Sequence, residues 1–216
     1  DVKIESITEK WGVFVLAGPD SRSLLQDLTG KNFSSDAFPW LSGQEIKIGK
    51  STAHAIRVNF VGELGWELHH PIEEQNTLFD MLFDVGKKYD LKPFGIRAMD
   101  SLRLEKSYRL IPRELSIEYS ALESGLERFV DQSKGDFTGK AGLQEWQKSG
   151  FKWKFVTLEV FEIEDADPRG SEPIYANSEL VGRCTSGGYG WRVEKSLALG
   201  MIDSKYSELN TLLEVE

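Results

Sequence analysis

The run RVNFVGELGWEL, residues 57–68, constrains the fold more than any other part of the chain. On both sides of it, apolar and polar residues alternate with the two-residue period of a strand that buries one face. Gly62 and Gly65 interrupt this pattern, which predicts a tight turn or a place where something approaches the backbone closely. Glu63 and Glu67 flank the second glycine. A carboxylate held on such a turn is a good acceptor for a planar pair of N–H donors.

Composition limits the class of protein. The 216 residues are 40% hydrophobic and include 6 tryptophans, which is enough for a substantial core. The formal net charge of −9 argues against a general nucleic-acid binder. No apolar stretch approaches the roughly 20 residues that a membrane-spanning helix needs, so we expect no membrane segment.

The supply of metal-ligating and redox-active side chains is small. The single cysteine, Cys184, excludes an internal disulfide and fits a reducing compartment. His54, His69 and His70 are the only histidines, and neither a CxxC nor an HExxH spacing occurs. We therefore expect no metal site, and we place the chain in the cytoplasm or, in a eukaryote, in the mitochondrial matrix.

Residues 1 to about 150 predict a mixed α+β domain. On one of its expected helices, Asp100, Arg103, Glu105 and Arg109 have the spacing of a salt-bridge lattice. Apart from its last two residues, the segment 110–130 looks irregular. Strands are expected at 13–17, 44–48, 55–60, 66–69 and 129–130, and helices at 20–28, 74–89, 97–108 and 139–148.

From residue 151 the pattern changes to short strands separated by Gly, Asn, Asp and Ser. Their regular spacing predicts a small barrel or sandwich, so we predict two domains, 1–150 and 151–216. Strand-like residues reach both ends of the chain, which suggests a fragment of a longer polypeptide. The strands of the second domain are expected at 155–161, 172–175, 180–185, 196–200 and 212–215.

Four motifs follow one another along the chain. They are VGELGWE at 61–67, GIRAMDSLRLE at 95–105, DFTGK at 136–140, and TSGG at 185–188 with SLALG at 196–200. In this order they resemble the motifs of the glycine cleavage T-protein family, which are folate-dependent aminomethyltransferases. Further runs are similar to the T-protein-like half of dimethylglycine and sarcosine dehydrogenases and oxidases, and the resemblance covers nearly the whole chain. These runs are FPWL at 38–41, GWELHHP at 65–71, EKSYR at 105–109 and GGYG at 187–190.

The resemblance implies a T-protein-like folate-binding domain followed by a small C-terminal β-barrel, with tetrahydrofolate as the cofactor. Glu67 falls on the glutamate that anchors the pterin, although it could instead pair with Arg57 or face water. Phe60 stands where the family has a tyrosine, so it keeps a flat face and loses a hydroxyl. The arginine of the family's second motif is Met99 here. Arg97, two positions earlier, points to another face of the helix and cannot simply inherit that role.

Three further residues are candidate folate contacts by the same resemblance. Arg128 could pair with the glutamate tail of folate, Tyr189 could close over a ligand, and Glu63 lies on the same turn as the pterin anchor. Each has an alternative interpretation. Arg128 could be a solvated surface charge, Tyr189 could pack one end of the barrel, and Glu63 could bond to the turn backbone.

The family's catalytic aspartate would lie upstream of Asp1, and no GxGxxG fingerprint of a flavin site occurs. We therefore expect the chain alone to be inactive, with FAD confined to an N-terminal half outside these residues. The resemblance implies the tetrahydrofolate-binding portion of an enzyme that oxidatively demethylates an N-methyl amine of the dimethylglycine or sarcosine type. The alternatives are a stand-alone aminomethyltransferase or folate-dependent demethylase, and a non-catalytic folate-binding module. The expected partners are folate, a small methylated amine and other domains of the same polypeptide.

Overall fold

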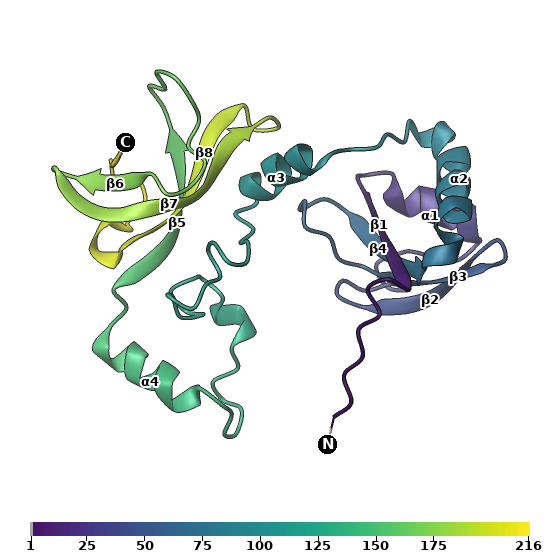
Figure 1. Cartoon of the computed structure of the whole chain (residues 1–216), viewed down its shortest axis with the longest axis horizontal. Coiled ribbons are helices and arrows are strands. Elements are labelled where there is room, and N and C mark those ends of the chain that lie inside the picture. Colours follow the sequence, from purple (N-terminus) through teal and green to yellow (C-terminus); the bar gives the residue numbers. More distant parts are fainter. Residues whose placement is uncertain (1) are drawn as a thin grey trace. The chain divides into compact units, whose positions relative to one another are not determined.

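The computed structural model describes residues 2–216 and forms two compact units, Asp1–Ile96 and Arg97–Glu216 (Figure 1). Each unit combines helices with an antiparallel sheet, as the predicted α+β class requires. The boundary predicted near residue 150 lies inside the second unit, between the helix Lys140–Ser149 and the strand Trp153–Val160. As a domain boundary it stays a prediction.

The first unit is built on a four-stranded antiparallel sheet with the strand order β1-β4-β3-β2, so β4 lies inside the sheet. Two short 3-10 turns, η1 and η2, flank its second helix. In chain order the elements are β1 Trp11–Ala17, α1 Ser21–Thr29, β2 Gly43–Ile48, β3 Ser51–Ile56, β4 Gly65–Pro71, η1 Ile72–Glu74, α2 Gln75–Gly86 and η2 Lys87–Tyr89.

The alternation along the strands decides which face of this sheet is buried. Leu16 and Trp66 on the strands are at most 6% exposed, and they belong to one core with Leu25 of α1 and Leu78 of α2. The two helices therefore cover this face of the sheet (Figure 1). Residues at the alternate positions, Glu67 among them, lie on the opposite and partly exposed face.

The strand predicted at 55–60 is wrong beyond Ile56. The backbone N–H of Arg57 donates to the carbonyl of Ser42 at 2.9 Å, which extends the β2–β3 register by one residue pair, whereas that of Val58 turns back to the carbonyl of Ile56 at 2.9 Å. The Val58 bond satisfies a group that would otherwise continue the strand pairing, so the chain leaves the sheet here. The rest of the run belongs to the loop that precedes β4.

The second unit is built around a five-stranded antiparallel sheet with the order β5-β8-β7-β6-β9. The strands predicted after residue 151 are all present. A β-bulge between Cys184 and Ser186 interrupts the register between β7 and β8. In chain order the elements are α3 Ile96–Glu105, η3 Glu127–Phe129, α4 Lys140–Ser149, β5 Trp153–Val160, β6 Pro173–Ala176, β7 Glu179–Gly190, β8 Lys195–Asp203, η4 Ser204–Tyr206 and β9 Glu214–Val215.

The strand predicted at 129–130 is wrong. The N–H of Phe129 donates to the carbonyl of Leu126 at 2.9 Å, and the N–H of Val130 donates to that of Glu127 at 3.1 Å, which makes the 3-10 turn η3. The Phe129 side chain is 60% exposed. Aromatic residues favour strands because they pack on a half-buried sheet, and that packing is absent at Phe129.

Candidate functional site

The loop between β3 and β4 is closed by an asparagine. The Nδ2 of Asn59 donates to the carbonyl of Glu63 at 2.5 Å, and the Oδ1 of Asn59 accepts the N–H of Val61 at 3.0 Å. Gly62 between them has φ 72°, a left-handed conformation that favours glycine. The carbonyl of Glu63, rather than its carboxylate, therefore takes part in the turn, and Glu63 is exposed.

Gly65 begins β4 because a side chain would not fit there. A Cβ atom at this position would lie 2.6 Å from the carbonyl oxygen of Leu16 and 3.1 Å from the Cα of Ala17. Both neighbours are backbone atoms of β1, which pairs with β4. The two interpretations of the glycine pair are thus both confirmed, a turn at Gly62 and a close backbone approach at Gly65.

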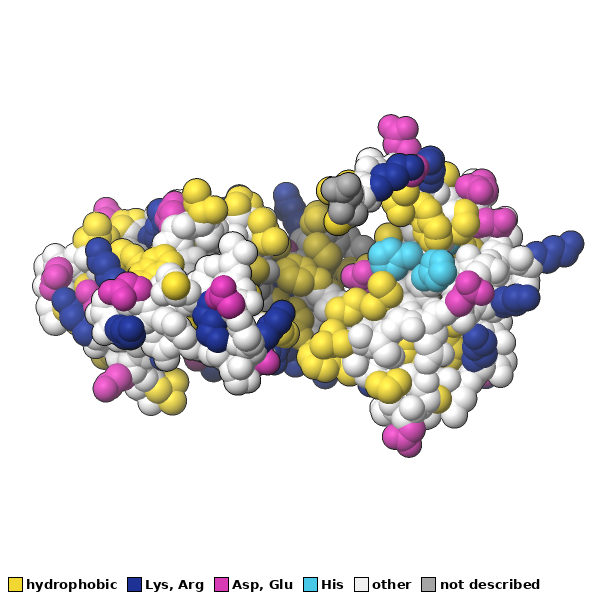
Figure 2. Space-filling model, turned by 90° about the horizontal axis from the view of Figure 1, so that it is seen from below, with side chains coloured by type: hydrophobic (Ala, Val, Ile, Leu, Met, Phe, Trp, Pro, Cys, Tyr) yellow, Lys and Arg dark blue, Asp and Glu magenta, His cyan; other side chains and the backbone are white. Residues whose placement is uncertain are grey.

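The uncovered side of the first sheet carries aromatic, apolar and ionisable side chains together. The cross-strand register places Val15 and Ile56 beside Glu67. Trp11 stacks on His54 with ring centroids 5.5 Å apart. Figure 2 shows histidine side chains, in cyan, at the surface beside hydrophobic ones. We call this surface the open face, and it consists of Trp11, Val13, Val15, His54, Ile56, Glu67 and His69.

Glu67 is the carboxylate of the open face. Its side chain is 31% exposed, and its Oε2 lies 3.0 Å from the Nε2 of His69, two residues along the same strand. Among residues 2–216, Oε1 of Glu67 has no hydrogen-bond partner, so it can accept a donor from a ligand. Arg57, the alternative partner, instead donates to the carbonyl of Phe38 at 2.7 Å. The carboxylate is therefore half-buried, held by one histidine and open on one oxygen.

The other predicted contacts fall into two places. Phe60 is partly buried in the loop that leads to Glu67. Arg128 and Tyr189 belong to the second unit. Arg128 lies over the ring of its neighbour Phe129 at 4.6 Å, and Tyr189 packs edge-on against Trp191 with centroids 5.0 Å apart. As contacts to folate, all five predicted residues stay predictions.

The sequence does not predict a buried polar network in the second unit. Arg103 on α3 is fully buried, with its Nε donating to Asp100 at 2.6 Å and its Nη1 donating to the carbonyl of Tyr108 at 3.1 Å. The carboxylate of Glu114, also fully buried, lies 3.8 Å from the same Nη1. The Asp100–Arg103 pair of the predicted salt-bridge lattice is therefore confirmed, although Arg103 itself is buried in the unit rather than exposed on the helix surface.

Two other members of that predicted lattice bind backbone groups instead. Arg109 donates to the carbonyls of Ser124 at 2.8 Å and Gly125 at 3.2 Å, and burial lowers the pKa of its guanidinium. Glu105 accepts the N–H of Arg192 at 2.8 Å. These bonds connect neighbouring segments of the same unit.

Glu114 is the centre of the buried network. Its Oε2 accepts the N–H of Leu110 at 2.8 Å, and its Oε1 accepts the hydroxyls of Thr185 at 2.5 Å and Ser186 at 2.6 Å. The β-bulge explains how two successive residues of β7 reach one carboxylate. The two adjacent hydroxyls of Thr185 and Ser186 in a predicted strand are the signal that could have indicated a buried acceptor, although they do not identify that acceptor.

Across residues 2–216, no three or more His, Cys, Asp or Glu side chains come together in a way that could hold a metal ion. None of the helices in that range combines the length and the apolar character that a membrane crossing requires.

Two family models match the chain. The GCVT N-terminal domain matches residues 1–134, and the Glycine cleavage T-protein C-terminal barrel domain matches residues 154–216. Human "Dimethylglycine dehydrogenase, mitochondrial" is 39% identical over 217 residues, which are 100% of this chain and 25% of that protein. "Aminomethyltransferase" from Thermoanaerobacter sp. (strain X514) is 34% identical over 215 residues, which are 100% of this chain and 58% of that protein.

The fold has a solved counterpart. The crystal structure of glycine cleavage system aminomethyltransferase T from Bartonella henselae superposes with a TM-score of 0.83 and 22% identity, covering 95% of this chain and 55% of that one. The family matches and this likeness confirm the predicted fold class, a mixed α+β fold with a C-terminal barrel domain. The chain belongs to the glycine cleavage T-protein family.

Proposed function

We propose that the chain is the tetrahydrofolate-binding portion of an enzyme that oxidatively demethylates an N-methyl amine and passes the carbon to tetrahydrofolate. The family relation supports folate-dependent one-carbon transfer, and the human relative is named for dimethylglycine. The chain spans a quarter of that relative and 58% of the bacterial aminomethyltransferase, so the whole enzyme's activity is part of the proposal. FAD would belong to the remainder of the whole enzyme, in the cytoplasm or the mitochondrial matrix.

The observation that carries the proposal is the state of Glu67. An ionised carboxylate accepts two parallel N–H bonds, and charge-assisted bonds of this kind are stronger than neutral ones. Oε2 already has His69 at 3.0 Å, while Oε1 is open and the side chain is two-thirds covered. The amino group and ring N–H of a pterin are a matching pair of donors, so Glu67 would hold that edge.

The surroundings of Glu67 suit a flat ring. Val15 and Ile56 lie opposite it on the neighbouring strands and would pack against the ring. Phe60, in the loop before β4, offers a flat side chain in place of the family's tyrosine. Tetrahydrofolate, when bound, supplies the nitrogens that accept the one-carbon unit. The residues of this chain would orient the folate and exclude water from the labile carbon.

A second candidate is a stand-alone aminomethyltransferase or related folate-dependent demethylase. The larger share of the bacterial relative that the chain covers, 58%, favours it. The sequence upstream of residue 1 in the gene discriminates between the two. A flavin fingerprint far upstream supports the dehydrogenase, and a start about 150 residues upstream, one domain's length, supports the transferase. Loss of the family's aspartate from that upstream segment would support a non-catalytic folate-binding module.

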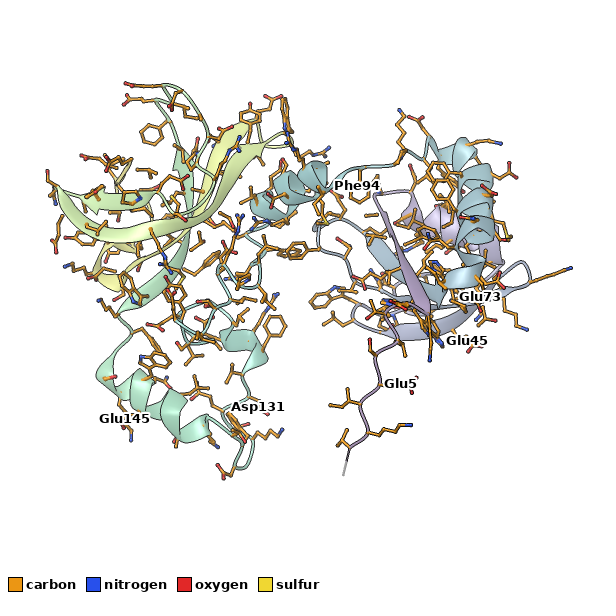
Figure 3. All side chains as sticks on the ribbon, in the orientation of Figure 1. Glu5, Glu45, Glu73, Phe94, Asp131 and Glu145 are labelled. Atoms are coloured by element: carbon orange, nitrogen blue, oxygen red, sulfur yellow. The ribbon has the colours of Figure 1, made fainter. Side chains whose placement is uncertain are left out.

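Calorimetric titration with folinic acid tests the site. Glu67→Gln keeps the size of the side chain and removes its charge, and we expect it to weaken binding by about 1.5–3 kcal/mol, the range for a hydrogen bond to a charged group. Glu73→Gln is the matched control, because Glu73 is an exposed carboxylate in η1 of the same unit (Figure 3). Equal affinities in the unaltered chain and the Glu67→Gln variant would remove Glu67 from the site.

A further inference from the structure

A polar pocket of about 320 Å³ lies in the second unit, and none of the residues assigned above to folate lines it. Three arginines line it, Arg113 and Arg169 from two loops and Arg183 from β7. We call it the arginine pocket. Its volume is at the small end of the range for small-molecule sites. The remaining lining residues are Pro112, Ser116, Glu118, Gly170, Ser171, Cys184 and Thr185.

The loop that carries Arg169 is fastened to β7. The carboxylate of Glu172 accepts the backbone N–H groups of Arg169 at 2.8 Å and Gly170 at 2.7 Å. The N–H of Ser171 donates to the carbonyl of Cys184, and the N–H of Cys184 donates to the carbonyl of Glu172, both at 2.8 Å. The pocket wall is thus fixed before any ligand arrives, which lowers the entropic cost of binding.

The carboxylate of Glu172 is already hydrogen-bonded to the backbone of this loop. Burial acts to raise the pKa of Glu172, but the N–H groups of Arg169, Gly170 and its own backbone, with the charge of Arg113, outweigh burial and hold its pKa below the usual range. Glu172 is also absent from the pocket lining.

The pocket has an excess of positive charge. Three arginines and one glutamate line it, which leaves a net charge of three minus one, or +2, and the adjoining carboxylate of Glu172 lowers the local excess to +1. Arg183 pairs with that carboxylate, Glu118. Arg113 donates to the backbone carbonyl of Arg169 at 3.2 Å, and in residues 2–216 neither Arg113 nor Arg169 has an acidic partner within 4.0 Å. The chain as a whole carries a net charge of −9, yet three arginines gather around this one pocket. An anionic ligand would account for that local concentration of positive charge.

We propose that the arginine pocket binds a small dianion that carries carboxylate or phosphate groups. Guanidinium groups present forked N–H donors that match both oxyanions, and three arginines line this one pocket. The free guanidinium of Arg169 and that of Arg113 would hold one anionic group. Arg183 would hold the other, in competition with Glu118. The hydroxyls of Ser116 and Ser171 add neutral donors at the rim.

Titration calorimetry of the full chain at low ionic strength tests the proposal. The probes are succinate, inorganic phosphate and the neutral analogue succinamide. We expect saturable binding of succinate or phosphate and none of succinamide, and the tighter of the two anions identifies the ligand class. Arg169→Gln should raise the Kd about tenfold, the usual effect of losing one charge-assisted contact. Glu118→Gln should lower the Kd about threefold or more, because it frees Arg183 and removes a competing charge.

Arg192→Gln is the matched control, since Arg192 is an exposed arginine of the same unit outside the pocket. It should change the Kd less than about twofold, by weak long-range screening alone. Three results would overturn the proposal. They are the absence of saturable binding by both anions, an equal loss in the Arg169 and Arg192 variants, or a Glu118→Gln variant that binds no more tightly than the unaltered chain.

Discussion

Gly65 and Glu67 occupy alternate positions of β4, on the same side of the sheet. Gly65 allows close strand pairing, whereas Glu67 places a carboxylate on the open face. Gly65 lets the backbone of β1 lie close against the start of the strand, since its missing side chain leaves the carbonyl of Leu16 unobstructed. Two residues later, Glu67 emerges on the open face with one oxygen held by His69 and one free. The close strand pairing that Gly65 permits fixes the position of the carboxylate.

Gly65→Ala should therefore destabilise the first unit by about 1–3 kcal/mol, the cost of forcing an extra carbon into a packed site. The nearest obstructing atom, the carbonyl oxygen of Leu16 at 2.6 Å, is backbone and cannot rotate away, and the Cα of Ala17 and the Nδ2 of Asn59 both follow at 3.1 Å. Gly95→Ala is the control, because a Cβ there meets nothing within 4 Å and its φ is not positive. Urea unfolding of both variants measures the difference, and an unchanged midpoint for Gly65→Ala would contradict the close approach.

Single buried polar residues were the least predictable part of the molecule. The motif around Glu67 could be interpreted from its glycines, because the backbone restricts what can stand there. Arg103 and Glu114 carry no such signal. Their spacing and surroundings in the sequence are those of surface charges, and only the tertiary fold brings Glu114 to the hydroxyls of Thr185 and Ser186. These contacts join residues about 70 positions apart in the sequence, so no local sequence pattern can predict them.

At the scale of elements, the periodicity of apolar residues predicted those helices and strands that pack one face against a core. The strands of the second sheet and the helix α2 were predicted because each buries one face, as the core residues show. The predictions that failed are the end of the strand expected at 55–60 and the strand expected at 129–130, where strand-like residues lie outside the sheets. Local turn bonds satisfied their backbones instead.

Cys184 reports on the integrity of the second sheet. It is 1% exposed on β7, and burial, with the charge of Glu172, raises the pKa of its thiol to about 12. The thiolate is the reactive form, so a disulfide reagent at pH 8 should react very slowly with the folded chain and fully in urea. Because the folded chain holds the proton more tightly, its stability should fall as the pH rises from about 8.5 toward 12.

The single cysteine makes the thiol assay specific, since every reacted thiol is Cys184. Rapid stoichiometric reaction of the folded chain at pH 8 would contradict a closed β6-β7-β8 arrangement.

At the scale of the whole molecule, we expect folate binding and catalysis of the one-carbon transfer to depend on different residues. The 216 residues include the family's N-terminal domain match and its barrel match, with Glu67 in the first. A site that holds a substrate lowers no barrier unless it favours the transition state over the ground state. On the proposed function, Glu67 would contact the pterin, remote from the nitrogens that carry the carbon, and Glu63 lies in the loop just before β4. Under that proposal neither residue would be the acid or base of the transfer.

The isolated chain should therefore not accelerate the formation of 5,10-methylenetetrahydrofolate from formaldehyde and tetrahydrofolate above the spontaneous rate. Product absorbance with and without the chain measures this. Acceleration that disappears in a Glu63→Gln or Glu67→Gln variant would show that these residues complete a catalytic site.

Whether Glu67 anchors the pterin of a bound folate is tested most directly with ligands that contain or lack the pterin. Titrations with folinic acid and with p-aminobenzoylglutamate, which lacks the pterin, would be compared in the unaltered chain and in Glu67→Gln. We predict that the substitution weakens the binding of folinic acid about ten- to a hundredfold and leaves the binding of p-aminobenzoylglutamate unchanged. A Glu67→Gln variant that binds folinic acid as tightly as the unaltered chain, or that loses both ligands equally, would contradict this prediction.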